Sequence, residues 1–204
     1  MFMNKIDQIY SDSNSIKDYS RLYMQCLASV LKSISLTDIE KFVEVLLEAR
    51  DRESSIFFIG NGGSAATASH FANDIAIGTR SYQKPFRAIS LCDNQSVITA
   101  IANDDGYEKI FSQQLEVLLK KQDVVVAISA SGNSPNLIQA IDIVKQMGAI
   151  SVGISAFDGG KLKEIVDVSL HVPTEKGEYG PAEDAHMVLD HLISSYLMRL
   201  VRSS

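Results

Sequence analysis

Five apolar runs of strand length alternate with helical patterns through most of this chain. Continuous apolar character, rather than strict alternation with polar residues, is typical of strands that are covered on both faces. The alternation of strands and helices predicts an α/β fold with a mostly parallel sheet flanked by helices. The expected strands are Ser55–Gly60, Phe86–Leu91, Asp123–Ser129, Ala149–Ser155 and Val166–Pro173. The expected helices among and after them are 64–77, 95–102, 107–119, 135–147, 160–165 and 182–201.

Two further helical patterns precede the first expected strand. Asp18–Ser35 carries apolar residues at helical spacing, and the next helix is expected to be capped by Thr37, which forms a capping box with Glu40. Residues 1–17 are polar and irregular, so we expect a flexible arm there. The chain of 204 residues then forms one domain over 1–204, with helices at 18–52 as an N-terminal extension.

These N-terminal helices carry more apolar residues than a single sheet can cover. That surplus predicts a homo-oligomer, because exposed apolar faces favour association. The residues that suggest it include Leu22, Met24, Leu46 and Leu47.

Charge and cysteine content narrow the functional classes. The net charge of -6 argues against a nucleic-acid-binding protein, which usually shows a basic face. No apolar run approaches the roughly 20 residues that a membrane span requires, and the N-terminus lacks the apolar stretch of a signal peptide. Cys26 and Cys92 do not have metal-type spacing, and buried, reduced thiols are the simplest interpretation. We expect a cytoplasmic protein with no membrane partner and no nucleic-acid partner.

Two polar loops each follow an expected strand and precede an expected helix. The first is GNGGS (60–64), whose glycines allow backbone N–H groups to approach a ligand closely. We expect Ser64 to cap the next helix, whose free N–H groups favour an anion. The second is SASGNSP (129–135), in which Ser134 is a good N-cap and Pro135 suits the first helical position. Its hydroxyl and amide groups would hold phosphate oxygens without a lysine.

Each loop could also be a plain strand–helix turn. GNGGS matches neither the GxGxxG pattern nor the Walker lysine pattern. Both loops, however, leave the sheet at the carboxyl ends of parallel strands, where ligands normally bind. Taken together they favour a site for a phosphorylated ligand.

Two of the expected helices carry histidine and carboxylate side chains. His70 and Asp74 are four residues apart and therefore share one helix face. Histidine and carboxylate ligands suit zinc. The last helix carries a dense polar cluster beside apolar residues, so one edge of that helix must be buried. A solvated helix face with an ordinary, hydrogen-bonded histidine is the alternative, and we favour it for His186. The cluster consists of Glu183, Asp184, His186, Asp190 and His191.

The loops and their surroundings resemble the signature motifs of the sugar isomerase (SIS) domain family, and within it those of the sedoheptulose-7-phosphate (phosphoheptose) isomerases. The resemblance rests on GNGGSAATASHFAND (60–74), IANDDGYE (101–108), AISASGNSPN (127–136) and FDGGKL (157–162). It implies a single SIS domain with a flavodoxin-like three-layer fold. It also implies a phosphorylated sugar as substrate and a homotetramer with its sites at subunit interfaces.

The resemblance implies a role for each matching position. Either Asp74 or Glu183 could take the proton in catalysis, and His191 could deliver it or hold the metal. One zinc ion per subunit is expected on His70, Asp74, Glu183 and His191. Substrate contacts are expected from Asn61, Gly62, Gly63, Ser64, Asn103, Asp104, Ser129, Ala130, Ser131, Ser134 and Glu183.

Four features depart from the pattern of the isomerases. Asp74 stands where a glutamate is usual, which shortens a candidate base by one methylene. Glu183 stands where a glutamine is usual, and Ala130 stands where a threonine is usual. One extra residue lies between Asp74 and Arg80. A displacement on the order of 1 Å can cost roughly 10²-fold in rate. Because Asp74 and Glu183 together would neutralise the charge of a bound zinc ion and make it a weaker Lewis acid, we expect firm metal retention and modest turnover.

The sequence therefore predicts an aldose–ketose isomerase. Its expected reaction converts sedoheptulose 7-phosphate to a manno-heptose 7-phosphate for nucleotide-activated heptose and a surface polysaccharide, either lipopolysaccharide or capsule. The alternatives are an isomerase of another sugar phosphate, a non-catalytic SIS protein that binds a protein partner, and a sugar-phosphate sensor. His70 and His191, each with carboxylates nearby, argue against a binding-only protein. A sensor would need a DNA-binding segment, and the sequence shows none.

Overall fold

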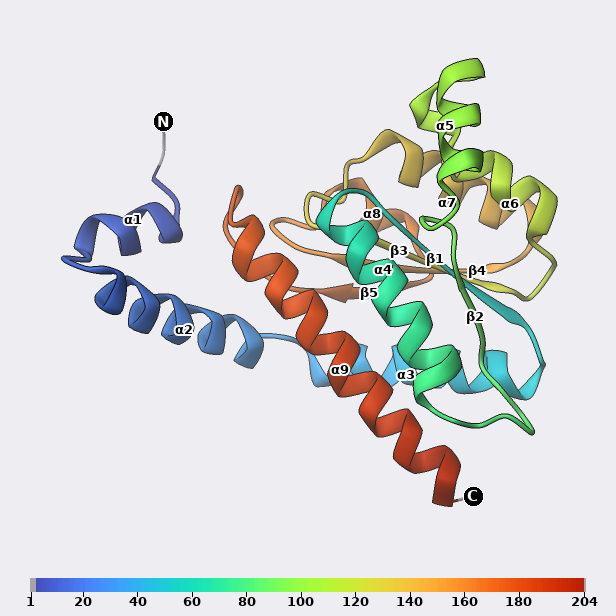
Figure 1. Cartoon of the computed structure of the whole chain (residues 1–204), viewed down its shortest axis with the longest axis horizontal. Coiled ribbons are helices and arrows are strands. Elements are labelled where there is room, and N and C mark those ends of the chain that lie inside the picture. The colour runs from blue at the N-terminus through green and yellow to red at the C-terminus, as the bar shows by residue number, and fades with distance from the viewer. Residues whose placement is uncertain (1–2, 204) are drawn as a thin grey trace.

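The computed structural model describes residues 3–203, in which five strands form one sheet that helices cover on both faces (Figure 1). All neighbouring strands run parallel, in the order β2-β1-β3-β4-β5. The expected α/β fold is confirmed, and the sheet is parallel throughout. The strands are β1 (Ser55–Gly60), β2 (Arg87–Ser90), β3 (Val124–Ser129), β4 (Ile150–Ser155) and β5 (Val168–His171).

The helices of the described residues fill the intervals between the strands and the two ends of the chain. They are α1 (Lys5–Asp12), α2 (Ile16–Lys32), α3 (Leu36–Asp51), α4 (Gly63–Asn73), α5 (Gln95–Asp104), α6 (Ser112–Leu118), α7 (Pro135–Met147), α8 (Gly160–Ile165) and α9 (Tyr179–Ser203). A π-helical turn, η1 (Asp74–Gly78), extends α4, and a 3-10 turn, η2 (Tyr107–Lys109), precedes α6.

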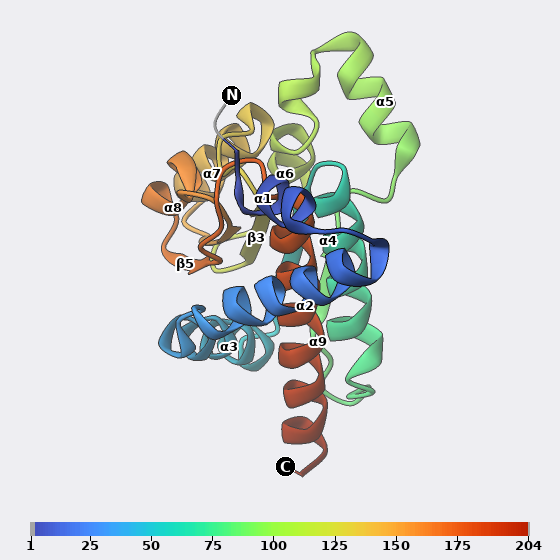
Figure 2. The same cartoon turned by 90° about the vertical axis from the view of Figure 1, so that its left-hand side faces the viewer.

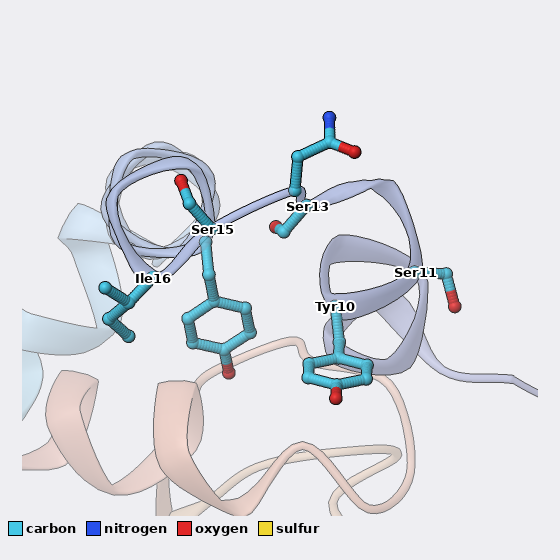
Figure 3. A pocket seen from close by; sticks show the side chains of 7 residues that line it. Tyr10, Ser11, Ser13, Ser15 and Ile16 are labelled. Atoms are coloured by element: carbon cyan, nitrogen blue, oxygen red, sulfur yellow. The ribbon is translucent and has the colours of Figure 1, made fainter.

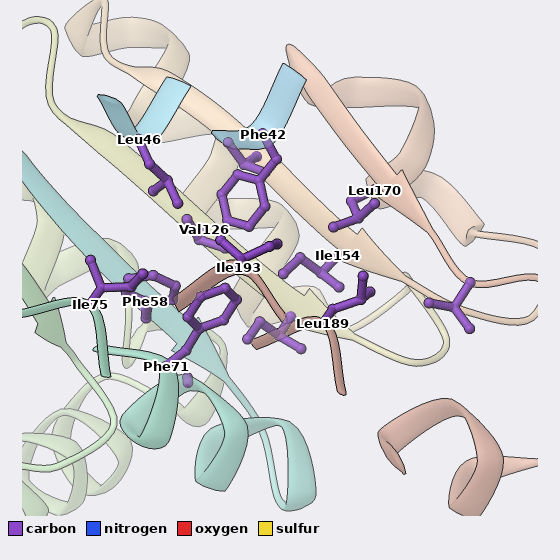
Figure 4. Close-up of a cluster of buried hydrophobic side chains, with 14 of the residues drawn as sticks. Phe42, Leu46, Phe58, Phe71, Ile75, Val126, Ile154, Leu170, Leu189 and Ile193 are labelled. Carbon is purple, nitrogen blue, oxygen red and sulfur yellow. The ribbon is translucent and has the colours of Figure 1, made fainter. Parts of the chain in front are cut away.

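Each face of the sheet has its own apolar core. Successive strand residues point to opposite faces, so Phe58 and Phe57 contribute to different clusters. The Phe58 cluster also takes in Phe71 of α4 and Leu189 of α9 (Figure 4). The Phe57 cluster includes Leu115 of α6 together with apolar residues of α7 and α8. Burial on both faces explains why the strands read as continuous apolar runs.

Most of residues 3–17 are helical, unlike the irregular arm expected over residues 1–17, of which residues 1 and 2 lie outside the described residues. Residues 5–12 form α1, because Asn4 and Asp7 make a reciprocal capping box. The Asn4 side chain accepts the Asp7 N–H at 2.9 Å, and the Asp7 carboxylate accepts the Asn4 N–H at 3.2 Å. An asparagine three residues before an aspartate was a visible helix-start signal in the sequence.

Helices α1 and α2 stand apart from the sheet, and α2 packs against α9 (Figure 2). Between α1 and α2 lies a groove of about 710 Å³ that is lined by Tyr10, Tyr19 and short polar side chains (Figure 3). The two tyrosine rings meet edge-to-face with their centroids 6.4 Å apart. This packing gives the N-terminal pair a small apolar contact of its own.

Several helix boundaries differ from the expected ones. Ser35, not Thr37, caps α3, since its hydroxyl accepts the Asp38 N–H at 3.2 Å. The single helix expected at 107–119 is divided into η2 and α6, and α9 begins at Tyr179 rather than at residue 182. Several neighbouring residues near a helix end can supply the capping hydrogen bond. The residue that does so in the folded chain sets the boundary, which sequence patterns predict only to within one or two residues.

The segment between Asp74 and Arg80, where the resemblance predicts one extra residue, forms η1. A π-helical turn closes hydrogen bonds from residue i to residue i+5, so it accommodates one more residue than an α-helical turn. Such turns are frequent at functional sites. The insertion expected from the resemblance stays a prediction, and η1, which begins at the expected metal ligand Asp74, is the segment where it would lie.

Within residues 3–203, none of the helices combines the length and apolar character that crossing a bilayer requires.

Cys26 and Cys92 are free and half-buried, rather than fully buried as expected. Leu46 is completely buried in the core, so it cannot contribute to an oligomer contact, whereas the Met24 side chain is 62% exposed.

Candidate functional site

The two polar loops lie side by side at the carboxyl edge of the sheet. They follow β1 and β3, which pair in parallel from Ile56 with Val124 to Gly60 with Ile128. The strand order reverses direction at this pair, with β2 on one side and β4 on the other, and such switch points are the usual ligand crevices of open α/β sheets. The expectation that both loops share one edge is confirmed.

A pair of asparagines joins the two loops directly. Asn61 donates through Nδ2 to Asn136 Oδ1 at 2.9 Å, and Asn136 donates back to Asn61 Oδ1 at 2.8 Å. The Tyr107 hydroxyl donates to the same Asn61 oxygen at 3.0 Å. Asn61 therefore holds the loops in a fixed relation, and Tyr107 and Asn136 are site residues that were not singled out from the sequence.

The first loop turns sharply into α4. Gly62 has a φ of 55°, which favours glycine, and it occupies the N-cap position. Ser64 is buried inside the first turn of α4, so the expectation that it caps this helix is wrong. With no side chain on Gly62 to accept the first N–H groups, this end of α4 presents its free amides to a ligand.

The second loop is built from serines around a left-handed glycine. The Ser129 hydroxyl accepts the Gly132 N–H at 3.1 Å, and the Ser131 hydroxyl accepts the Asn133 N–H at 3.3 Å. Ser134 is the N-cap of α7, as expected, but among the described residues its side chain makes no capping hydrogen bond. The Ser134 hydroxyl is therefore not committed to the helix end.

The FDGGKL segment (157–162) supports the second loop through hydrogen bonds. The Leu162 N–H donates to the Gly132 carbonyl at 2.9 Å, and the Lys161 N–H donates to Asn133 Oδ1 at 3.0 Å. A side chain on Gly132 would overlap the carbonyl oxygen of Gly159. The close approach of these two glycine-containing segments explains the motif, whose role the sequence did not reveal.

Asn103 and Asp104 lie at the end of α5 and are both exposed. The Asn103 amide donates to the Asp104 carboxylate at 2.7 Å. The contact from this part of the chain to the first loop is made by Tyr107, three residues further on. The substrate contacts expected of Asn103 and Asp104 thus stay a prediction.

Side chains of α4 and α9 form a second polar group, which we call the α4–α9 cluster. The His70 Nε2 atom lies 3.5 Å from Asp74 Oδ2 and 3.3 Å from His191 Nε2. Asp190 completes the cluster: each of the four residues offers one possible ligand atom, and these atoms all lie within 4.8 Å of one another. Two imidazoles and two carboxylates are a donor set that suits a divalent metal such as zinc.

Glu183, the other expected ligand, is not in this group among the described residues. Its carboxylate occupies the space that a side chain on Gly63 would need, at the start of α4. Glu183 therefore borders the first loop, where it was also expected to contact substrate. The structure brings together three of the four expected metal residues and adds Asp190.

The position of Asp190 follows from the buried stripe of α9. A spacing of three and four residues is the signature of a helix face that packs on a core. This spacing is present in the sequence and was the signal that could have identified Asp190 as buried. The buried positions on α9 include Ala182, Ala185, His186, Leu189, Asp190, Ile193 and Leu197.

Burial changes the pKa of two side chains on that stripe. Burial, with the nearby Asp74 charge as the second cause, raises the pKa of Asp190 to about 8. Burial lowers the pKa of His186 to about 4. The nearby Ser155 backbone opposes part of this decrease. Within the described chain, neither the Asp190 oxygens nor the His186 ring nitrogens have a hydrogen-bond partner. His186 is thus buried, but not the hydrogen-bonded histidine that was expected.

A cavity of about 270 Å³ adjoins the α4–α9 cluster. It is lined by Asp74 and Gly78 of η1 and by His191, Ser194, Ser195 and Met198 of α9. Its volume is just below the 300–1,000 Å³ range typical of small-molecule sites.

Comparison with known proteins identifies relatives over most of the chain. The family model described as "SIS domain" matches residues 18–156. A phosphoheptose isomerase of Helicobacter pylori (strain P12) is 36% identical over 161 residues, covering 79% of this chain and 83% of the relative. A phosphoheptose isomerase of Aliarcobacter butzleri is 33% identical, covering 84% and 89%. The solved structure of a phosphoheptose isomerase from Neisseria gonorrhoeae superposes with a TM-score of 0.80 at 26% identity, covering 90% and 98%.

Proposed function

This chain belongs to the SIS domain family, and on that basis we propose that it is a phosphoheptose isomerase. The proposed reaction is the interconversion of sedoheptulose 7-phosphate and a manno-heptose 7-phosphate. It is an aldose–ketose isomerisation, which moves a proton between two neighbouring carbons and needs a base, an acid and a group that stabilises negative charge on oxygen.

One observation carries this proposal: the first glycine loop, which Asn61 joins to the serine loop before α7, and the histidine–carboxylate cluster lie at two points along α4. His70 follows Gly63 by seven residues of α4, a distance of about 10 Å along the helix axis. Helix α9 runs beside α4 in the same direction, because Glu183 lies at Gly63 and His191 lies at His70 (Figure 1). An extended sugar phosphate is of similar length.

The phosphate is proposed to bind at the second loop. The hydroxyls of Ser129, Ser131 and Ser134 and the first N–H groups of α7 are the available donors at that helix end. Pro135 at the first helical position leaves the following amides oriented along the helix axis. The Ala130 side chain, which lacks a hydroxyl, is buried and leaves the binding to its neighbours.

The α4–α9 cluster is proposed to hold one zinc ion. The fit is supported by its donor set and by the carboxylate of Asp190, whose burial without a partner is unfavourable unless a cation is bound. When bound, zinc would supply Lewis acidity to the sugar carbonyl. His70 and His191 would have to be neutral to act as ligands, so metal affinity is expected to fall in acid.

Proton transfer is proposed to use a carboxylate near the carbonyl end of the sugar. Asp74 and Glu183 are the candidate bases, and His191 is the candidate group for delivering a proton to oxygen. Glu183 borders the first glycine loop, and Asp74 borders the cavity beside the cluster. Their separation means that only one of them can reach the carbon that loses the proton.

The active enzyme is proposed to be a homotetramer with sites at subunit interfaces. Within the described chain, α5 has no buried residue although it carries Val97, Ile98 and Ile101. Helix α5 projects from the body of the molecule in both views (Figures 1 and 2). The small cavity beside the cluster fits a site that a neighbouring copy completes.

The product is proposed to supply nucleotide-activated heptose for a surface polysaccharide, lipopolysaccharide or capsule. We propose a cytoplasmic location, in keeping with the free thiols of Cys26 and Cys92.

The test is incubation of purified protein with sedoheptulose 7-phosphate in deuterated water, followed by NMR. Deuterium is expected at the carbon next to the new carbonyl, because the abstracted proton exchanges with solvent. Fructose 6-phosphate, run in parallel, separates a heptose enzyme from an isomerase of another sugar phosphate. Asp74→Asn, which has nearly the same size as wild type but lacks the candidate basic carboxylate, is the matched variant for this assay. Absence of exchange with every sugar phosphate would leave a binding protein as the function of this chain.

A further inference from the structure

Asp190 is a buried acid without a partner. Its relative exposure is 0%, and neither carboxylate oxygen is hydrogen-bonded within residues 3–203. An ionised carboxylate that leaves water needs a paired charge or a metal. Leu189 and Ile193 on the same stripe of α9 show that an apolar residue would suit this environment. Core packing therefore does not explain why this position carries an acidic side chain.

The surroundings of Asp190 offer no protein cation. None of the ion pairs among the described residues includes it, and the nearby Asp74 carboxylate repels it. His186 lies one turn earlier on the stripe, but its ring nitrogens make no hydrogen bond to any described residue, Asp190 included. What Asp190 does approach is the pair of imidazoles of His70 and His191. Two carboxyl groups and two imidazoles at one point are the donors that a divalent cation such as zinc would satisfy.

We propose that Asp190 is a metal ligand, so that one copy of the chain holds the ion through His70, Asp74, Asp190 and His191. The proposal rests on the metal site of the proposed function, and it replaces Glu183 by Asp190 in the ligand set. Glu183 precedes Asp190 by seven residues, about 10 Å along α9. It stays at the glycine loop as a group for the substrate.

Metal binding alone tests this proposal, without sugar. Wild type, Asp190→Asn and Glu183→Gln are stripped of metal, then titrated with zinc by calorimetry and with cobalt by its visible absorption. Both substitutions remove one carboxylate charge at nearly constant size, so each is a control for the other. We expect Asp190→Asn to weaken zinc binding by at least about 10-fold. Removing a residue that only supports a ligand already costs about 10- to 100-fold in metal affinity, so removing a ligand should cost at least as much. It should also change the cobalt spectrum, while Glu183→Gln leaves both close to wild type.

Thermal unfolding of the same proteins gives a second readout. We expect metal-free Asp190→Leu to melt at a higher temperature than metal-free wild type, because it removes an unpaired buried carboxylate, and to gain little from added zinc. An aspartate that merely supported the fold would give the opposite order. Loss of zinc affinity in Glu183→Gln but not in Asp190→Asn would overturn the proposal, as would a wild-type protein that binds neither zinc nor cobalt. Normal metal binding without isomerisation of any sugar would contradict only the proposed function.

Discussion

The hydroxyls of Ser131 and Ser134 should contribute directly to substrate binding. Each is expected to donate a charge-assisted hydrogen bond, worth about 1.5–3 kcal/mol, so each alanine variant should raise KM roughly 10- to 100-fold. Ser134→Ala is the cleaner variant, because that side chain makes no capping bond within the described chain. Steady-state kinetics is the measurement.

The matched control is Ser35→Ala, which removes a hydroxyl that does cap a helix, far from the loops. It should lower the free energy of unfolding by about 1 kcal/mol and leave KM unchanged. Unchanged KM in both loop variants would mean that the second loop only connects β3 to α7.

His186 should make stability depend on pH in the acid range. Its folded pKa is about 4, below the usual value of 6.5, because burial disfavours the charged ring. Above pH 6.5 the ring is neutral in both states and has no effect. As the pH falls from 6.5 to 4, only the unfolded state binds the proton, so the free energy of unfolding decreases by about 3 kcal/mol.

Urea denaturation of wild type and His186→Gln at pH 7.5 and pH 5 measures this effect. The difference between the two proteins isolates His186, since Asp190 is present in both. We expect the variant to lose less stability on acidification than wild type. Equal losses would show that the ring is protonated in the folded protein.

Two glycines at the site should respond differently to alanine. Gly132 has a φ of 64°, and its new side chain would overlap the Gly159 backbone, which cannot move away without disrupting the braced loop. Gly132→Ala should therefore lower the free energy of unfolding by at least about 1–2 kcal/mol. Gly63 has an ordinary helical backbone, and its new side chain would displace only the flexible Glu183 carboxylate.

Gly63→Ala should thus fold with wild-type stability but turn over more slowly. Chemical denaturation and kcat, measured on both variants, separate the two effects. Wild-type kcat in Gly63→Ala would show that the Glu183 carboxylate has no part in catalysis at the first loop.

For the assembled protein, α9 exposes an apolar row that the monomer leaves uncovered. Val188, Leu192 and Tyr196 are spaced four residues apart and are 37%, 46% and 52% exposed. We expect light scattering to give a mass several times the 22.3 kDa of one chain, with four copies as the expected number. Leu192→Lys should reduce that mass, because it places a charge in the apolar row.

A single-chain mass at micromolar concentration would contradict the oligomer. Gln139→Lys is a control, since it adds the same charge at an exposed position of α7, away from α9. Loss of activity together with loss of mass in Leu192→Lys, but not in the control, would support sites at subunit interfaces.

The sequence by itself determined the strands, the two loops and the spacing of His70 and Asp74. Each depends on residues close together in the chain: a run of apolar side chains, a Gly-rich turn after it, or a four-residue step on one helix face. The capping box of Asn4 and Asp7 belongs to the same class, although polar composition obscured it.

Tertiary structure alone decided which carboxylate of α9 meets the histidines. Glu183 lies eight residues before His191 and Asp190 lies directly before it, and neither spacing shows which carboxylate reaches the two imidazoles. The choice depends on how α9 is rotated and displaced against α4, which is set by Ala182, Leu189 and Ile193 packing into the core. That packing places Asp190 beside the imidazoles and leaves Glu183 at the glycine loop. Because a helix is rigid, burial of its apolar stripe also fixes the direction in which every other side chain points.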